Sequence, residues 1–361
     1  MASAPRKPLD VVTVRLSEPR PDEIRVRMVG AGVCHSAVIA RDQVYPVPLP
    51  VIPGDEGAGV VEAVGAAVTS VEAGDHVVLG FNSCGVCARC LSGHPSNCRG
   101  FFDYNFGGFR PDGSSPVSLA GKPVAGSFFG QSSFSSHVVV PARIAVKVPE
   151  DLPLDLLAPL GCGVMTGAGA VLNVLKPVPG GTFAVFGTGA VGFSGLLAAK
   201  AAGCTTIIAT DIVGERLAQA EELGATHVVN SRTTDVVKAV RDITGGEGVD
   251  YALDAVGVSA VFAQMAESLA TRGHGVLVGA PNPGDLAGVD VGALLTGAPR
   301  LSMVIEGDAV PHEFIPRLLR LYRAGLLPFD KLIRKYPLAE VNEALADSES
   351  GATVKPVLTF D

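Results

Sequence analysis

Residues 183–203 read FAVFGTGAVGFSGLLAAKAAG, which is an apolar run, a glycine-rich turn and a helix-like segment in that order. Gly187, Gly189 and Gly192 form the pattern G-x-G-x-x-G within it. Glycine there allows a tight turn, close approach of a pyrophosphate and close packing of helix on strand. The start of the helix adds N–H donors and a partial positive charge for phosphates. The stretch therefore predicts a dinucleotide-binding βαβ unit.

The second strand of this unit is expected at residues 205–210 and leads to Asp211, 24 residues after Gly187. A carboxylate at that point accepts hydrogen bonds from the adenosine ribose hydroxyls and repels a 2′-phosphate. We therefore expect Asp211 to favour NAD over NADP. A glycine-rich turn beside a solvated aspartate is the alternative that the same residues allow.

Strand-like and helix-like segments alternate from residue 183 to residue 278. The strand-like segments are apolar without alternation, which is typical of strands buried on both faces of a parallel sheet. The expected strands are 183–186, 205–210, 227–229, 249–253 and 275–278, and the expected helices are 190–203, 215–223, 236–243 and 258–269. This order predicts a doubly wound parallel sheet.

Residues 1 to about 160 indicate β structure instead. Ile24, Val26 and Met28 alternate with arginines, which is the period of a half-buried strand. Further strand-like runs at 59–64, 76–79 and 137–140 are separated by turn signals, so we expect a barrel-like β domain. From about residue 300 onward the alternation of strand-like and helix-like segments is lost. We expect the chain from there to its end to return to the first domain.

Four cysteines lie close together in CGVCARCLSGHPSNC, residues 84–98. They are Cys84, Cys87, Cys90 and Cys98, with C-x2-C-x2-C-x7-C spacing. Four thiolates on a short loop that contains glycine and proline are what tetrahedral zinc requires. Such a site has no open position, so we expect it to be structural. Redox-active or disulfide-bonded cysteines are the alternative.

Length and charge limit the possible functions. The chain has 361 residues, more than one typical core holds, so two domains are expected. It has 28 basic and 36 acidic residues and no basic stripe, which argues against nucleic-acid binding. The first residues contain no apolar signal core, and no run of about 18 apolar residues occurs. We therefore expect a soluble, cytoplasmic protein without a membrane partner.

These motifs resemble the zinc-dependent medium-chain alcohol dehydrogenases over nearly the whole chain. The resemblance is carried by the cysteine loop and GTGAVG (187–192), with GVCHS (32–36), GDEGAGVVEAVG (54–65), LGCGVMTG (160–167) and KPVLTF (355–360). FFGQSSF (128–134) and EGDAVPHEFIP (306–316) are similar to the benzyl (aryl) alcohol dehydrogenases. The implied α/β fold is a GroES-like β-barrel catalytic domain plus a Rossmann domain. The expected bounds are 1–162 with a zinc lobe at 80–110, 163–298, and a return at 299–361.

The resemblance also implies roles for single residues. Cys34, Asp55 and Cys162 would hold the catalytic zinc. Glu56, the next residue along the chain, is an alternative ligand instead of Asp55 or beside it, which its position suggests and the resemblance does not. Ser36 would pass the hydroxyl proton of the substrate onward.

The remaining implied roles concern the cofactor and the substrate. His35 and Lys355 would reach the pyrophosphate, Arg216 would lie near the adenosine ribose, and Thr166 and Val191 would pack on the nicotinamide. Phe128 and Phe129 align with pocket positions of the family, and Gly80 falls where a bulky aromatic often stands. Such a pocket suits a flat ring.

Two positions depart from the family pattern. Asp55 stands where the family has a histidine, and Ala37 stands where it has an aspartate that orients that histidine. An aspartate oxygen is an acceptable zinc ligand, but it makes the site one unit more negative and the metal a weaker Lewis acid. Ile39 stands at the position of a relay histidine. Because Asp55 replaces the usual histidine ligand, a degenerate site that holds no zinc remains an alternative.

The expected reaction interconverts a primary, aromatic or allylic alcohol and its aldehyde by hydride transfer to and from NAD. We expect two zinc ions per chain and a homodimer or homotetramer. Two alternatives remain at this point: a zinc-free or zinc-degenerate NAD(P)H reductase of the same fold, and a non-catalytic NAD-binding protein.

Overall fold

The computed structural model describes residues 1–360, whose contacts divide into two compact units. Unit 1 contains Met1–Gly163, Val310–Pro316 and the described residues from Asp330 onward. Unit 2 contains Val164–Ala309 and Arg317–Phe329. The chain therefore leaves unit 1 and returns to it.

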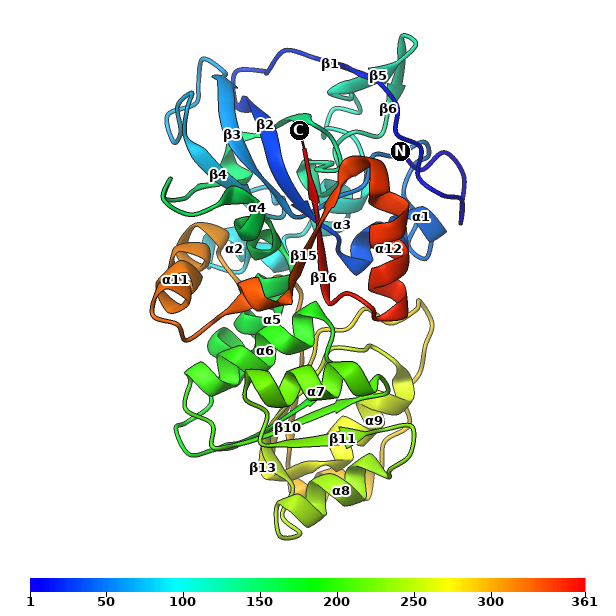
Figure 1. The fold of residues 1–361 in the computed structure, drawn as a ribbon, viewed down its shortest axis with the longest axis vertical. Helices are drawn as coiled ribbons and strands as arrows, with labels where there is room; N and C mark the ends of the chain where they lie inside the picture. The colour runs from blue at the N-terminus through cyan, green and yellow to red at the C-terminus, as the bar shows by residue number, and fades with distance from the viewer. Residues whose placement is uncertain (361) are drawn as a thin grey trace. The chain divides into compact units, whose positions relative to one another are not determined.

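Unit 2 is built on a six-stranded parallel sheet in the order β11–β10–β9–β12–β13–β14. Its strands β10, β11 and β13 are labelled in Figure 1. Its strands are β9 (Thr182–Phe186), β10 (Thr206–Asp211), β11 (His227–Asn230), β12 (Val249–Asp254), β13 (Leu269–Leu277) and β14 (Arg300–Met303). Its helices include α6 (Ala190–Ala201), α7 (Gly214–Leu223), α8 (Val236–Ile243), α9 (Ser259–Glu267) and α10 (Val291–Gly297). The predicted doubly wound sheet is confirmed.

Helices cover both faces of this sheet. Val240 of α8 and Met265 of α9 pack in one apolar cluster with strand residues such as Ala184. On the other face α6 lies so close that a Cβ at Gly195 would come 2.3 Å from Leu253. The strand order turns back beside β9, where doubly wound sheets bind nucleotides. The sheet also extends past residue 298, because β14 pairs with β13.

Unit 1 is a mostly antiparallel β structure of seven strands in the order β15–β16–β2–β3–β4–β8, with β7 paired to β2. The strands are β2 (Glu23–Gly32), β3 (Gly57–Val64), β4 (His76–Leu79), β7 (His137–Pro141), β8 (Ala145–Lys147), β15 (Ile333–Pro337) and β16 (Lys355–Thr359). A small sheet is formed by β1 (Arg15–Leu16), β5 (Val117–Leu119) and β6 (Lys122–Val124). The core cluster includes Ile24, Val26 and Met28, the predicted apolar face of β2.

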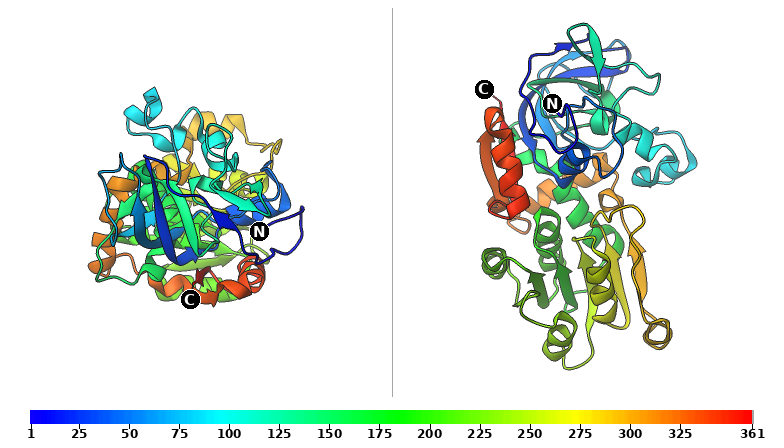
Figure 2. Two further views of the ribbon diagram at one scale, coloured as in Figure 1. Left: turned by 90° about the horizontal axis from the view of Figure 1, so that it is seen from above. Right: turned by 90° about the vertical axis from the view of Figure 1, so that its right-hand side faces the viewer.

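Short helices connect these strands. They are α1 (His35–Asp42), α2 (Ala88–Leu91), α3 (Phe101–Phe106), α4 (Leu154–Leu157) and α12 (Val341–Ser350). The residues of α5 (Gly163–Gly169) and α11 (Pro311–Arg323) are divided between the two units. The loop with the four clustered cysteines, drawn in cyan, projects from unit 1 in the right-hand view of Figure 2.

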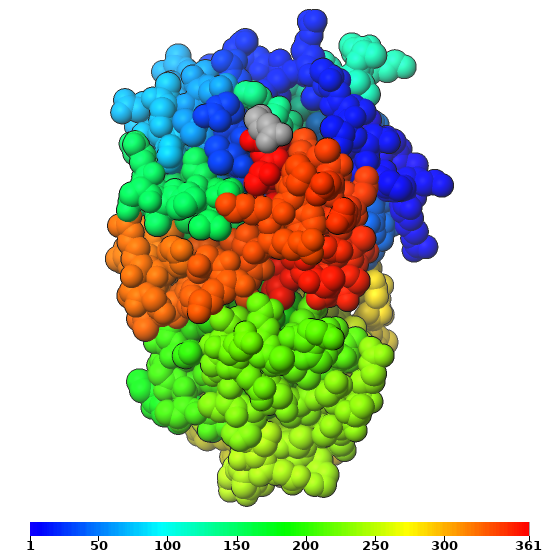
Figure 3. All heavy atoms as spheres, viewed as in Figure 1, coloured from blue at the N-terminus to red at the C-terminus, as the bar shows by residue number. Residues whose placement is uncertain are grey.

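Strand β2 organises unit 1 because it pairs with β3, β7 and β16. Register shifts at Arg25/Val26 and Met28/Gly30 bend it, as β-bulges do, so its two ends face different partners. In the space-filling view, red residues from the C-terminal end of the chain lie directly beside blue residues from its N-terminal part (Figure 3), in agreement with the pairing of β16 with β2. Unit 1 is thus closed by segments that are far apart in the sequence.

Candidate functional site

The four clustered cysteines form a compact sulfur cage. Their ligand atoms all lie within 4.8 Å of one another, and Cys90 Sγ is 3.9 Å from Cys84 Sγ and 3.6 Å from Cys87 Sγ. Zinc–sulfur bonds of about 2.3 Å at tetrahedral angles place two sulfurs about 3.8 Å apart. The cage therefore fits zinc, and the spacing prediction for this lobe agrees with the geometry.

Backbone hydrogen bonds and burial shift the pKa values of these thiols in opposite directions. N–H groups of Arg99 and Cys90 lower the pKa of the Cys87 thiol to about 6, whereas burial raises the pKa of Cys90 to about 12. The N–H of Cys87 also donates to Cys84 Sγ at 3.3 Å. A divalent cation is what allows all four sulfurs to be thiolates together.

A second group brings together three residues that are distant in sequence. Cys34 precedes α1, Asp55 precedes β3, and Cys162 follows the short helix η4 (Ala158–Gly161). Their ligand atoms lie within 4.8 Å of one another, and the two Sγ atoms are 3.8 Å apart, the separation that tetrahedral zinc requires. The predicted set of Cys34, Asp55 and Cys162 is therefore assembled in unit 1.

The Asp55 carboxylate provides the test of fit. Asp55 is fully buried, and neither carboxylate oxygen has a partner of hydrogen-bonding geometry. Burial raises its pKa, opposed by nearby Ser36 and by the positive charge of Lys355. A buried carboxylate without partners is costly unless a cation neutralises it. Two sulfurs and an orphaned oxygen fit zinc.

Ser36, the predicted proton carrier, is the second residue of α1. It is buried, and its hydroxyl oxygen likewise has no hydrogen-bond partner among the described residues. Its role as proton carrier stays a prediction. His35, the first residue of α1, is exposed.

Glu56 lies beside this group but is held elsewhere. Lys355 Nζ donates to both Glu56 carboxylate oxygens at 2.9 Å and to Val33 O at 3.1 Å. The Gly163 N–H donates to Glu56 Oε1 at 2.7 Å. The group of three close ligand atoms does not include Glu56. The contacts with Val33 and Glu56 use all three N–H bonds of the Lys355 ammonium. The implied roles of Glu56 as a zinc ligand and of Lys355 at the pyrophosphate stay predictions.

The electrostatics of this pair follow from its burial. Burial lowers the pKa of Lys355, but attraction to Glu56 and to the two thiols outweighs that effect, so the pKa is raised. Burial raises the pKa of Glu56, and Lys355 opposes it. The ammonium therefore stays charged and stabilises negative charge near Asp55.

The glycine-rich turn of unit 2 has the predicted form. Gly187 has φ +86°, and a Cβ at Gly192 would come within 1.8 Å of Gly187 O. Asp211 ends β10, and its Oδ2 accepts hydrogen bonds from the Thr188 N–H (2.6 Å) and hydroxyl (2.7 Å). Asp211 therefore links the second strand to the turn, a contact that the sequence did not predict.

The other residues expected near the cofactor lie on helices of unit 2. Val191 is in α6, which begins directly after Gly189, and Arg216 is in α7. Thr166 lies in α5, and its hydroxyl is 3.5 Å from Glu306 Oε2, both residues being buried. The sequence marks Glu306 only as part of the segment 306–316, without a role of its own.

The residues expected to line the substrate pocket are buried in unit 1. Phe128 and Phe129 pack edge to face with Phe106, with ring centroids 5.7 and 5.2 Å away. A Cβ at Gly80 would lie 3.2 Å from the Pro311 ring, so that proline occupies part of the space left by the missing side chain. The aromatic residues form one cluster, as the sequence suggested, and their substrate role stays a prediction.

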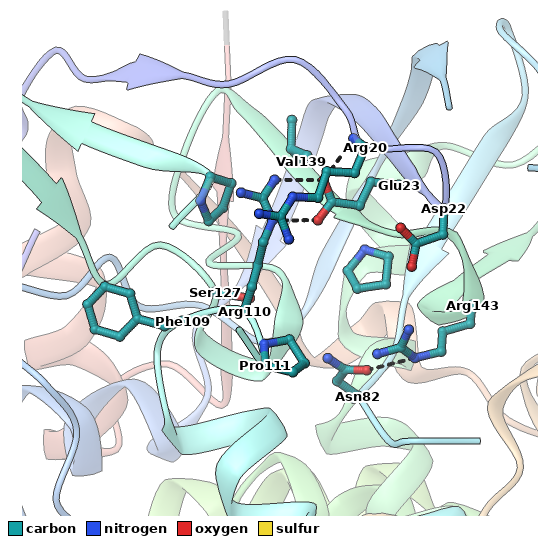
Figure 4. Close-up of a pocket in the computed structure, with 12 residues that line it drawn as sticks. Arg20, Asp22, Glu23, Asn82, Phe109, Arg110, Pro111, Ser127, Val139 and Arg143 are labelled. Atoms are coloured by element: carbon teal, nitrogen blue, oxygen red, sulfur yellow. Dashed lines mark hydrogen bonds and ion pairs between the residues drawn. The ribbon is translucent and has the colours of Figure 1, made fainter. Parts of the chain in front are cut away.

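A separate small cavity of about 90 Å³ lies in unit 1 (Figure 4). Arg110 and Glu23 form a buried ion pair there, with Nε–Oε1 and Nη2–Oε2 distances of 2.6 Å. Arg143 donates to Asn82 Oδ1 at 3.2 Å. Its acids and cations are mostly paired, and its lining contains none of the predicted site residues.

Comparison with known proteins agrees with this geometry. A family model described as alcohol dehydrogenase GroES-like domain matches residues 20–150, and one described as zinc-binding dehydrogenase matches residues 190–323. A geraniol dehydrogenase of Castellaniella defragrans is 46% identical over 355 residues, which cover 98% of this chain and 95% of that protein. The chain belongs to the zinc-dependent medium-chain alcohol dehydrogenase family.

Solved structures agree with this dehydrogenase fold. The benzyl alcohol dehydrogenase of Acinetobacter calcoaceticus has a TM-score of 0.93 and 44% identity, over 96% of this chain and 94% of that one. An alcohol dehydrogenase zinc-binding domain protein of Burkholderia ambifaria has a TM-score of 0.97 and 52% identity, over 100% and 97%. The predicted fold, family and enzyme class are confirmed. The dehydrogenase uses zinc and a nicotinamide dinucleotide.

No single helix among residues 1–360 has the length and apolar composition to cross a membrane, although the bent pair Leu154–Gly161 and Gly163–Leu175 would pass on length and composition together.

Proposed function

We propose that this dehydrogenase interconverts primary aromatic or allylic alcohols and their aldehydes with NAD. The reaction is R–CH2OH + NAD⁺ to R–CHO + NADH + H⁺. The observation that carries the proposal is the group of Cys34, Asp55 and Cys162 with its orphaned, buried carboxylate. The names of the two relatives, a geraniol and a benzyl alcohol dehydrogenase, support the substrate class.

In this proposal Cys34, Asp55 and Cys162 would hold the catalytic zinc, which supplies Lewis-acid polarisation of the substrate oxygen. Asp55 adds one negative charge that a histidine would not have. Ser36 would accept a hydrogen bond from the alcohol hydroxyl through its buried oxygen and pass the proton onward, giving up its own hydroxyl proton as it takes that of the substrate, so that the proton leaves as the H⁺ of the reaction.

In unit 2 the turn Gly187–Gly192 would bind the pyrophosphate, and Asp211 would bind the ribose. Thr166 and Val191 would position the nicotinamide for hydride transfer. Asp211 already accepts hydrogen bonds from Thr188, Ile212 and Val213, so its carboxylate is fixed before the ribose arrives. A fixed carboxylate supports our proposal that NAD is preferred over NADP.

We also propose that the dehydrogenase forms a homodimer or homotetramer. β14 is the last strand of the unit 2 order, so one of its edges has unpaired backbone groups. Met303 on β14, and Val291 and Leu295 on α10, are large apolar residues that are mostly exposed. A second copy would cover such an edge. The cytoplasmic location stays a prediction.

The test is metal analysis of the purified protein combined with an alcohol panel. We expect two zinc ions per chain and a kcat/KM for benzyl alcohol at least tenfold above that for ethanol. Burial of a ring contributes about 1.5–3 kcal/mol, and about 1.4 kcal/mol is tenfold. A higher kcat/KM for ethanol would reject the substrate class. One zinc per chain with reduction of alkenes or carbonyls would favour the zinc-free reductase.

A further inference from the structure

The side-chain amide of Gln131 spans the backbone on both sides of Glu56. Gln131 is almost fully buried, in the loop after η2 (Phe128–Gly130). The Gly57 N–H donates to its Oε1 at 3.0 Å, and its Nε2 donates to Asp55 O at 3.0 Å and to Gly80 O at 3.1 Å. The oxygen faces an N–H and the nitrogen faces carbonyls, so this pattern needs an amide.

The backbone of the same loop holds the residues before Asp55. The Ser133 N–H donates to Gly54 O at 3.0 Å, and the Phe134 N–H donates to Pro53 O at 3.1 Å. Gly54 has φ +103°, and a Cβ there would come 2.6 Å from Phe134 and Ser133. The loop therefore contacts the turn 53–57 at four of its five residues.

The Asp55 carboxylate depends on this backbone for its direction. An aspartate side chain has two rotatable bonds, so the position of its backbone largely determines where its oxygens lie. Neither oxygen is hydrogen-bonded, and Ala37, at the family position of an orienting carboxylate, carries no polar group. Metal ligands are normally oriented by such an outer partner.

We propose that Gln131 is the positioning residue for the metal ligand Asp55 and acts through the backbone carbonyl of Asp55 instead of its carboxylate. This inference rests on the proposed role of Asp55 as a ligand. Gln131 also binds Gly80 O and directly follows Phe128–Gly130, so one amide fixes the ligand turn relative to the predicted aromatic wall.

The experiment compares variants of Gln131 with a matched control. Gln131→Met keeps a similar length and removes all hydrogen bonding. Gln131→Glu keeps an acceptor for the Gly57 N–H and removes the donor to Asp55 O. The control is Asn105→Leu, because Asn105 is the buried amide that makes three hydrogen bonds beside the cysteine lobe, to Asn82 and Phe101.

The readouts are zinc content after dialysis against a chelator and the visible spectrum of the cobalt-substituted protein. Cobalt bound by four thiolates and cobalt bound by two thiolates and oxygen absorb differently. We expect both Gln131 variants to bind metal at the Asp55 site about 10–100-fold more weakly, as loss of an outer partner does, and to keep the lobe metal. Asn105→Leu should bind the lobe metal more weakly and keep the metal at the Asp55 site.

The outcomes separate this inference from the proposed function. An unmodified protein that holds only the lobe metal would reject Asp55 as a ligand and the inference with it. An unmodified protein with two metals, and Gln131 variants with unchanged release and spectrum, would overturn the inference alone. Release of both metals together on unfolding would also overturn it, because Gln131 would then be structural. If Gln131→Met does not fold, Gln131→Glu decides.

Discussion

The ion pair between Lys355 and Glu56 allows a quantitative test of the structure by the substitution Lys355→Met. The Lys355 side chain is 3% exposed and that of Glu56 is 0% exposed. Methionine fills a similar volume but removes the three N–H donors that meet Val33 O and both carboxylate oxygens. Among the described residues, Glu56 then keeps one hydrogen-bond donor, the Gly163 N–H.

Removal of one partner from a buried ion pair costs about 3–5 kcal/mol of stability. We expect a loss in this range because the Glu56 carboxylate remains buried next to Asp55, which is also fully buried. The double variant with Glu56→Gln should recover at least half of the loss, since no charge is then left unpaired.

The loss should depend on pH. Burial raises the pKa of Glu56 above its ordinary value of 4.5, and without Lys355 nothing of comparable size opposes this. A carboxyl group whose pKa is raised in the folded state contributes stability below its unfolded pKa, and that stability is lost as pH rises through the folded value. Lys355→Met should therefore be less destabilised at pH 5 than at pH 8.

The assay is urea denaturation followed by circular dichroism at both pH values. The control is Lys238→Met, because Lys238 pairs with Asp242 and the two side chains are 72% and 65% exposed. Exposed pairs contribute about 0–1 kcal/mol. A Lys355→Met loss no larger than that of the control would refute the reasoning. A double variant as unstable as the sum of its single changes would refute it too.

Three further predictions concern the two metal sites and the cofactor. Cys98→Ser should remove one of two zinc ions and lower stability, because structural zinc contributes folding free energy; metal analysis that still finds two zincs would contradict the lobe assignment. Asp211→Ser would remove the proposed hydrogen bonds to the ribose, each about 1.5–3 kcal/mol for a charged acceptor, together with the bonds from Thr188 that fix the turn, so NAD should bind at least tenfold more weakly and its preference over NADP should narrow. Isothermal titration with both cofactors checks this. Asp55→His should lower the apparent pKa of alcohol oxidation partly, and Asp55→His with Ala37→Asp should lower it more; a pH–rate profile indifferent to residue 55 would mean that it is not a ligand.

Features within short stretches of chain could be predicted from the sequence. Four cysteines between residues 84 and 98 can reach one metal whatever surrounds them, so spacing sufficed. The glycine turn at 187–192 needs one strand and one helix, which local patterning predicts. The grouping of Cys34, Asp55 and Cys162 came from the family resemblance, because no local pattern relates residues 128 positions apart.

Long-range polar contacts could not be predicted. Gln131 meets Asp55 across 76 residues, and Thr166 meets Glu306 across 140. No sequence pattern distinguishes a glutamine that holds the backbone of a metal-ligand turn from any other glutamine. The role of Gln131 is seen only from its buried hydrogen bonds in the folded chain. Lys355 meets Glu56 across 299 residues, and this contact too has no local signal, whereas its expected role at the pyrophosphate stays a prediction.

Because β16 is the last strand of the chain and pairs with β2, unit 1 cannot be completed until the end of the chain has been synthesised. Lys355 meets Glu56 across 299 residues, so at about 5–20 residues per second the two emerge roughly 15–60 s apart. The strands of unit 2 are all made between residues 182 and 303, so its sheet can close first. Until residues 355–359 appear, the part of the β2 edge at residues 30–32, which β7 does not cover, lacks its partner strand, and the Glu56 carboxylate lacks Lys355. We expect the nascent dehydrogenase to present that edge to chaperones during this interval, whereas the completed chain does not.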